Sequence, residues 1–171
     1  MSESSCLIEK LNGKQLQDIF NSFMLKSEFG ISDIKNENGK SIIKLNDGVR
    51  KFELHYILKN ISNGGWKDNV SIKRIQIGKI TDGLITTNRI RTHMLCGITK
   101  YQDKFILVVW NSYLYTNHST NRSCYIYQET IKNCYDRGYI LSHEFDQDIW
   151  LCDESHFNLL IRDYINYNYV E

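Results

Sequence analysis

Apolar residues recur at intervals of three and four along the first part of the chain. Between positions 13 and 26 they are Leu16, Ile19, Phe20, Phe23 and Met24. This spacing places all five on one side of an α-helix, whose period is 3.6 residues. The sequence therefore predicts an amphipathic helix over 13–26.

Alternation of apolar and polar residues, which is typical of β-strands, begins after a polar stretch. We interpret 30–40 (GISDIKNENGK) as a loop, because glycine bounds it and asparagine is frequent in it. Strands are predicted over 41–46 and 51–59, and Asp47-Gly48 between them is a strong hairpin signal. Every second residue from Phe52 to Leu58 is apolar or aromatic. One face of that strand should therefore join the core.

The middle of the chain combines a glycine-containing loop with further strands. Gly64-Gly65 marks the bend of a loop over 60–70, and the strand that follows over 71–80 has Arg74 and Gln76 on one face. Residues 81–93 show no clear period. Strands over 94–98 and 104–111 flank a turn at 101–103. The second of them, KFILVVWN, is the continuous apolar run of a central strand buried on both faces.

The last third of the chain mixes strands and helices. A polar loop over 113–123 precedes a short strand over 124–127 and a helix over 129–137 that ends at Gly138. A strand near 139–144 and a helix from about 154 to 164 complete the pattern, and Trp110 and Trp150 are predicted to be core. These elements give an α+β fold, built on about seven strands in a curled sheet or open β-barrel with flanking helices. A doubly wound parallel sheet is the weaker interpretation.

Length and composition favour one domain in the cytoplasm. The chain has 171 residues, 42% of them hydrophobic, with no long apolar run and no signal-peptide pattern at the start. Its five cysteines are widely spaced and form no CxxC pair, and its five histidines lack metal-ligand spacing. The cysteines are therefore expected to pack as small apolar side chains, and we expect no metal and no membrane association.

Charge is distributed unevenly along the chain. Residues 49–104 carry eleven Lys and Arg against four acids, whereas residues 142–171 carry seven acids against Arg162 alone. One region is thus strongly basic and the other strongly acidic. Such asymmetry can orient a protein on a polyanion such as nucleic acid, although a solvated, uneven surface would look the same.

Catalytic motifs are not evident. The acid and acid-x-lysine pattern of metal-dependent nucleases has only Asp33-Ile34-Lys35 and Asp68 as approximations, and there is no GxSxG, GxxxxGK[ST] or GxGxxG. We therefore expect a domain that binds and does not catalyse, without a cofactor. A Cys–His or Ser–His arrangement assembled from distant positions stays open.

Two loops carry the side chains with which proteins read DNA. Arginine and lysine bond guanine edges, asparagine and glutamine bond adenine, and hydroxyl groups fix phosphates. The candidates in the first loop and its strand are Asn63, Trp66, Lys67, Asn69, Lys73, Arg74 and Gln76. Those in the second loop are Tyr115, Asn117, His118, Thr120, Asn121 and Arg122. Ordinary turns in a chain without proline would use many of the same residues.

One stretch of the chain resembles a known family. The run NGGWKDN at 63–69, followed by KRIQI at 73–77, is similar to the glycine-rich loop and RIQ strand of B3-like DNA-recognition domains in prokaryotic restriction systems. Gly97-Ile98, the strand DKFILVVW at 103–110, Arg122-Ser123 and the helix ending at Gly138 follow in the same order. The resemblance covers about residues 50–140.

The resemblance implies a fold and a function. Such domains are seven-stranded pseudobarrels whose two arms, here 62–76 and 113–123, grip the major groove and read a short double-stranded site. They are fused to nucleases or form the N-terminus of McrB-like AAA+ GTPase subunits. Residues 1–171 are then expected to form a single DNA-recognition domain, the N-terminal part of a larger restriction subunit in phage defence. Its partners would be double-stranded DNA and a nuclease subunit, reached through a fused or associated motor.

Three other interpretations stay open. A reader of modified bases would flip the base into an aromatic pocket drawn from Trp66, Tyr113 or Tyr115. A metal-dependent nuclease would use Asp33 or Asp68. A protein-interaction adaptor would dock a basic partner on an acidic C-terminal helix that includes Asp153, Glu154 and Asp163.

Overall fold

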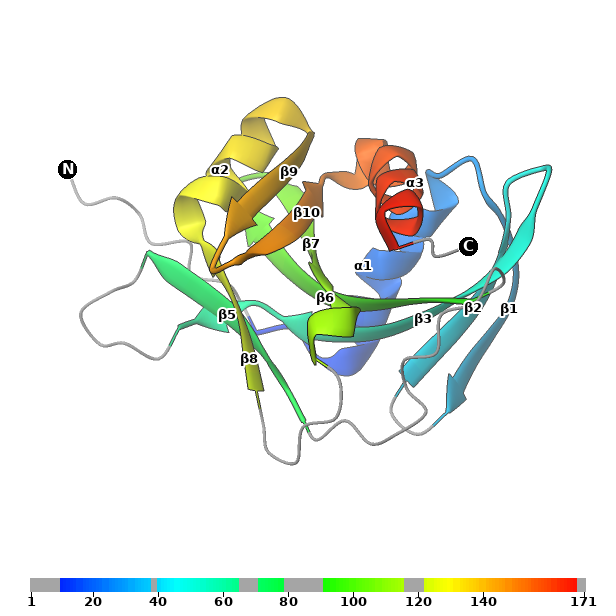
Figure 1. Cartoon of the computed structure of the whole chain (residues 1–171), viewed down its shortest axis with the longest axis horizontal. Coiled ribbons are helices and arrows are strands. Elements are labelled where there is room, and N and C mark those ends of the chain that lie inside the picture. The colour runs from blue at the N-terminus through cyan, green and yellow to red at the C-terminus, as the bar shows by residue number, and fades with distance from the viewer. Residues whose placement is uncertain (1–9, 38–39, 65–70, 79–90, 116–121, 169–171) are drawn as a thin grey trace.

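A curved sheet of seven strands runs through the protein, for which we analysed a computed structural model describing residues 10–37, 40–64, 71–78, 91–115 and 122–168 (Figure 1). Its strands lie in the order β1 (Gly30–Glu37), β2 (Lys40–Asn46), β3 (Lys51–Asn60), β6 (Arg91–Tyr101), β7 (Lys104–Asn111), β10 (Gln147–Cys152) and β9 (Tyr139–Glu144). All neighbours are antiparallel except β3 and β6, which are parallel.

The parallel pair explains where the second sheet comes from. Parallel neighbours need a crossover connection, so the chain must leave the sheet between β3 and β6. There it forms β4 (Ser62–Asn63) and β5 (Ile72–Ile77), which β8 (Arg122–Tyr127) joins to give a three-stranded sheet in the order β4-β5-β8. We call this the small sheet.

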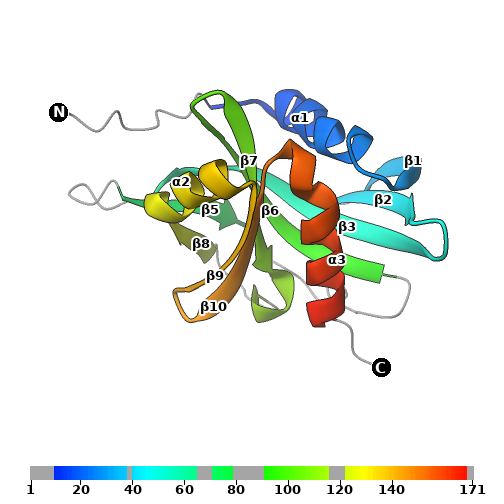
Figure 2. The same cartoon turned by 90° about the horizontal axis from the view of Figure 1, so that it is seen from above.

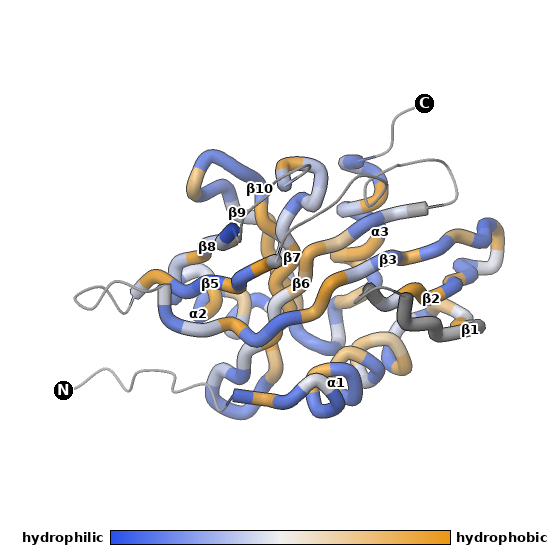
Figure 3. The backbone as a smooth tube through the Cα atoms, turned by 90° about the horizontal axis from the view of Figure 1, so that it is seen from below, coloured by the Kyte–Doolittle hydropathy of each residue, from blue (hydrophilic) through white to orange (hydrophobic). Residues whose placement is uncertain are grey.

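The large sheet is covered on both faces. Helices α1 (Gly13–Leu25) and α3 (Phe157–Asn168) pack in one core, and the small sheet and α2 (Gln128–Arg137) pack in another (Figure 2). Strand β7 contributes side chains to both cores. Leu107 and Val109 face the helices, and the alternate residues Ile106, Val108 and Trp110 face the small sheet. This confirms the prediction of a strand buried on both faces, and Figure 3 shows the central strands as predominantly hydrophobic.

Gly97 allows the two sheets to approach closely. A Cβ atom built at this position in β6 would lie 2.7 Å from Ile61, 2.8 Å from Ile75 and 3.0 Å from Trp110. No side chain larger than hydrogen fits there unless these neighbouring side chains shift. The glycine therefore sets the distance between β6 and β5.

Most of the predicted elements are confirmed. Helix α1 begins at a capping box, in which the Asn12 side chain accepts from the Gln15 amide N–H and the Gln15 side chain accepts from that of Asn12. The 47–48 hairpin, both strands around the 101–103 turn, and the end of α2 at Gly138, where φ is +85°, are as expected. Trp110 and Trp150 are fully buried, as are Cys96, Cys124, Cys134 and Cys152.

Two predictions were wrong. Residues 30–40 are not a loop, because 30–37 form the edge strand β1, paired with β2 and bulged between Ser32 and Ile34. The strand β10 was missed altogether, although it lies in the interior of the large sheet. The final helix also extends further than predicted, through a short 3-10 turn (Glu154–His156) into α3, which ends at Asn168. The described strands form two sheets with no barrel closure.

Candidate nucleic-acid interface

The two predicted arms meet in one sheet. Strands β5 and β8 pair along their whole length, with Arg74 opposite Tyr125 and Gln76 opposite Ser123. Side chains alternate along a strand, so these four share the outward face of the small sheet. The other face packs on the large sheet through Ile75, Ile77, Cys124 and Ile126.

Arg74 is half-buried at the centre of the outward face. Its Nη1 donates to Ser123 Oγ at 3.3 Å, whereas its Nε is enclosed without a hydrogen-bond partner in the described part of the chain. A guanidinium group has five N–H donors, so Arg74 retains donors for an external acceptor. Gln76, two residues along the same face, is exposed.

Lys73 lies on the opposite face of β5. Its side chain is 1% exposed, and Nζ donates to Asn63 Oδ1 at 2.7 Å. This contact joins β5 to β4 at the base of the first arm. Its ammonium group is enclosed, whereas Asn63 itself is exposed.

Arg122 and Tyr115 define the base of the second arm. The exposed Arg122 guanidinium lies 5.0 Å from the centre of the Tyr115 ring, within cation–π range. Tyr115 is buried, and its hydroxyl accepts from Gln147 Nε2 at 2.6 Å. Burial raises the pKa of Tyr115 well above its usual value. Tyr115 thus anchors Arg122 and presents little surface of its own.

Seven predicted residues cannot be placed. Trp66, Lys67, Asn69, Asn117, His118, Thr120 and Asn121 lie outside the described residues. Of the remaining candidates on β5 and β8, Arg74 and Gln76 share the outward face, whereas Arg122 is opposite Ile77 and falls in the alternation of the inward-facing residues of β8. Tyr113, the other aromatic residue of the predicted pocket, is half-buried beside the backbone of His93.

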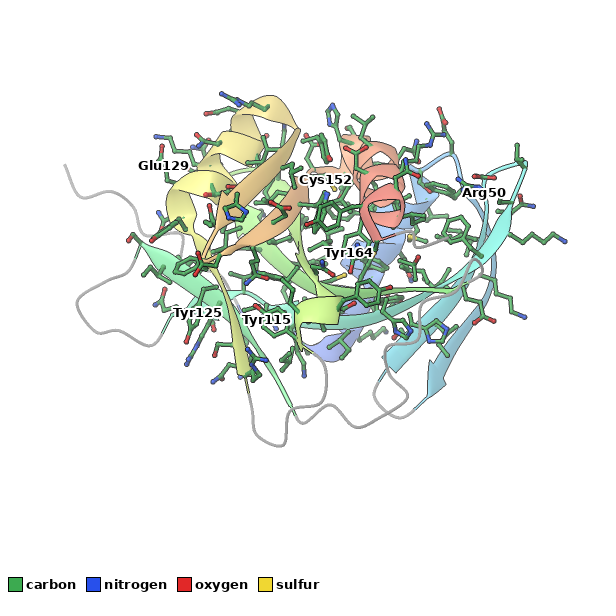
Figure 4. All side chains as sticks on the ribbon, viewed as in Figure 1. Arg50, Tyr115, Tyr125, Glu129, Cys152 and Tyr164 are labelled. Carbon is green, nitrogen blue, oxygen red and sulfur yellow. The ribbon has the colours of Figure 1, made fainter. Side chains whose placement is uncertain are left out.

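An aromatic cluster at the edge of the small sheet was not predicted. Tyr125 and Tyr127 on β8 contact Phe145 in the β9–β10 turn, with Tyr127 and Phe145 stacked at 4.7 Å between ring centres. Figure 4 shows Tyr125 on the small sheet, at the opposite end of the protein from Arg50. Alternation of tyrosine with Cys124 and Ile126 was the signal that could have revealed the two tyrosines.

Of the two acids proposed for a nuclease, the structure locates only Asp33. Asp33 lies in the edge strand β1, and Asp68 is outside the described residues. No group of three or more His, Cys, Asp or Glu in the described part of the chain could hold a metal ion. Burial raises the pKa of Cys124 and of Cys134 to about 12, so neither thiol is an ionised nucleophile near neutral pH.

The acids proposed for an adaptor surface all have partners within the chain. Asp153 is buried and accepts from the Ser155 amide and His156 Nδ1, Glu154 binds Lys26, and Asp163 accepts from the Tyr139 hydroxyl. Asp153 also precedes the final helical segment as its N-cap. These contacts stabilise the C-terminal segment and give the acids an internal role. Among the described residues no helix is long and apolar enough to cross a membrane.

The fold and this surface define a mixed α+β domain that carries a small three-stranded sheet, whose outward face bears Arg74, Gln76 and Tyr125. The chain belongs to the methylase-associated X1 family, whose model matches residues 52–157. The match starts in β3 and ends at the first residue of α3, so it includes the whole small sheet. Membership relates the chain to restriction-modification systems. The curated proteins gave no match to this chain, and neither did the solved structures.

Proposed function

We propose that this chain is the DNA-recognition domain of a restriction-modification system and binds duplex DNA with the outward face of the small sheet. The observation that carries the proposal is the pairing of β5 with β8, which unites Arg74 and Gln76 of one arm with Ser123 of the other. A two-stranded β-ribbon fits the major groove of DNA. The family match spans both arms and supports the same assignment.

The exposed side chains suit different parts of the duplex. Arg74 can donate two parallel hydrogen bonds to guanine O6 and N7 or, alternatively, bind a phosphate, and Gln76 can make two parallel hydrogen bonds with adenine. Arg122, exposed at the start of β8 and held over the Tyr115 ring, could make a phosphate contact that fixes orientation without reading sequence. The hydrogen bond between Lys73 and Asn63 joins β5 to β4 and so stabilises the base of the first arm.

The proposal also covers the mode of binding, the location of the domain and its partner subunits. The glycine-rich run at 63–69 and the KRIQI strand at 73–77 resemble those of B3-like domains, so we propose a B3-like, pseudobarrel-related mode of groove binding. We also propose that the domain binds without catalysing, in the cytoplasm, and that an McrB-like motor delivers it to a nuclease subunit. Support for these features comes from the resemblance at 50–140 and from the family's link to methylases.

The test is a fluorescence-anisotropy titration of a randomised duplex pool, followed by sequencing of the bound fraction. We expect binding at about 50 mM salt that weakens by orders of magnitude at about 200 mM, because bound cations release counterions from DNA. We also expect a short enriched motif. Tight binding with no enrichment would redirect the assignment to modified bases, which methylated duplexes would reveal. Absence of binding at both salt concentrations would contradict the proposal.

A further inference from the structure

The cluster formed by Tyr125, Tyr127 and Phe145 lies at the surface, whereas most aromatic clusters of this protein are buried. Tyr127 is 42% exposed, and the other two are partly exposed. Its ring is stacked on Phe145 with 26° between the planes, and Tyr125 lies 5.7 Å from Phe145. We call these three residues the aromatic platform.

Phe145 occupies a backbone position that does not suit it. Glu144 pairs with Gln147, so Phe145 and Asp146 alone form the turn, and their φ angles are +52° and +58°. Two-residue hairpins of this type favour asparagine and glycine, because a side chain crowds the backbone when φ is positive. A bulky ring at such a strained position, stacked beside two surface tyrosines, is an observation that points to function.

The charged residues around the platform indicate which class of ligand it would bind. Arg74 is directly opposite Tyr125 in the sheet and retains an enclosed Nε without a partner among the described residues. Two acids flank the platform. Glu144 is occupied, since it accepts from the Tyr127 amide at 2.8 Å, from Thr130 at 2.6 Å and from Ser142 at 2.9 Å, whereas Asp146 in the turn is exposed. Flat apolar rings next to a guanidinium group match a nucleotide, whose base has two π faces and whose phosphate is an anion.

We infer that the aromatic platform stacks an unpaired base of the bound DNA, while Arg74 contacts the phosphate of the same nucleotide. This inference rests on the proposed function and adds to it a specific class of ligand, a base displaced from its pair. Stacking tolerates every base, so the platform would detect the loss of pairing and the groove-facing side chains would read sequence.

The experiment compares two duplexes of identical sequence, one fully paired and one with a single bulged nucleotide at the centre, by anisotropy titration at low salt. Wild-type protein should bind the bulged duplex about tenfold more tightly, the effect of stacking one base on an aromatic side chain. Tyr127→Leu should remove this preference, because it should weaken binding of the bulged duplex about tenfold more than binding of the paired duplex. Tyr167→Leu, which truncates an exposed tyrosine on α3, should retain the preference.

A second variant separates loss of the platform from loss of folding. Phe145→Asn removes the ring but places a favoured residue at a positive φ, so its melting temperature should rise while the preference for the bulged duplex disappears. Either a retained preference in this variant or an equal loss in Tyr167→Leu would overturn the inference.

The outcomes also distinguish the inference from the proposed function. Wild-type protein that binds both duplexes equally would overturn the platform and leave duplex recognition in place. Binding of the bulged duplex alone would support the platform and overturn reading of intact duplex DNA. Failure to bind either would overturn both.

Discussion

The two faces of the large sheet use aromatic residues in opposite ways. On the helical face Phe20, Phe23, Phe157 and Tyr164 are completely buried and pack against one another or against Tyr56 and Trp150. On the other side, the small sheet buries aliphatic residues and Trp110 on its inner surface and leaves Tyr125 and Tyr127 on its outer surface. The helical face therefore provides stability, and the small sheet has surface available for a ligand.

Buried polar groups are satisfied to different extents. The buried Tyr164 hydroxyl donates to the His93 carbonyl and lies 3.4 Å from Ser112 Oγ, so its polar atom is satisfied within the helical core. Arg74 on the small sheet instead makes one long hydrogen bond and leaves Nε unpaired within the described residues. Trp150 Nε1 in the helical core is likewise enclosed without a partner among the described residues. A buried donor without a partner is unfavourable in either place.

Breaking the contact between the two layers should have the largest effect. Gly97→Ala introduces a methyl group within 3.0 Å of Ile61, Ile75 and Trp110, so these neighbouring side chains must shift. We expect a loss of about 2–3 kcal/mol in the free energy of unfolding and a melting temperature lower by roughly 5–10 °C. Thermal denaturation followed by circular dichroism measures both.

A second strand glycine provides the control for this prediction. At Gly30 in β1 an added Cβ would meet nothing closer than 3.7 Å, so Gly30→Ala should leave the melting temperature nearly unchanged. If the two substitutions were equally destabilising, the cause would be the loss of any glycine from a strand and not the close packing of the two sheets at Gly97.

Removing the cation on the outward face should have the next largest effect. Arg74→Met is expected to weaken DNA binding about tenfold and to reduce the slope of log affinity against log salt by about one, because one phosphate or base contact is lost. Arg50→Met removes the same charge from the β2–β3 hairpin at the far end of the protein and serves as the control (Figure 4). If both variants lost affinity equally, binding would depend on overall charge and not on the small sheet.

A smaller effect is expected from the neighbouring lysine. Lys73→Met replaces an enclosed ammonium group with an apolar chain of similar length and removes its hydrogen bond to Asn63. Because Lys73 binds Asn63 from the inner face, its loss should change DNA affinity by no more than about twofold and leave the salt slope as it was. A reduction in slope as large as that of Arg74→Met would place Lys73 in contact with phosphate.

Local patterns predicted most of this fold, and the exceptions have physical reasons. Helix α1 and strand β7 were recognisable because their apolar periods are unbroken. Strand β1 was not, because it is an edge strand rich in polar residues and its pairing with β2 is a tertiary property. Strand β10 was hidden because the turn before it is formed by Phe145-Asp146, without the asparagine or glycine that marks a hairpin.

The candidate site was predictable only in part, for a related reason. Arg74 and Gln76 could be assigned to one face from alternation alone, and that assignment agrees with the pairing of β5 and β8. That Lys73 and Tyr115 would be buried depends on residues distant in the chain, Asn63 being ten positions away and Gln147 thirty-two. The aromatic platform needs Phe145 and Tyr127 together, and no local pattern connects them.

The smallest predicted effect concerns the one acid in the platform's turn. Asp146 is exposed beside Phe145, so its carboxylate should repel the phosphates of DNA bound on the small sheet. Asp146→Asn keeps a residue that tolerates positive φ and should raise affinity about twofold at low salt, with the gain vanishing at high salt because exposed charges are screened. Asp136→Asn on α2, an equal change in net charge, should raise it less. An equal gain from both substitutions would mean that DNA responds to overall charge, and the contrast between the small sheet and the rest of the surface would lose its electrostatic part.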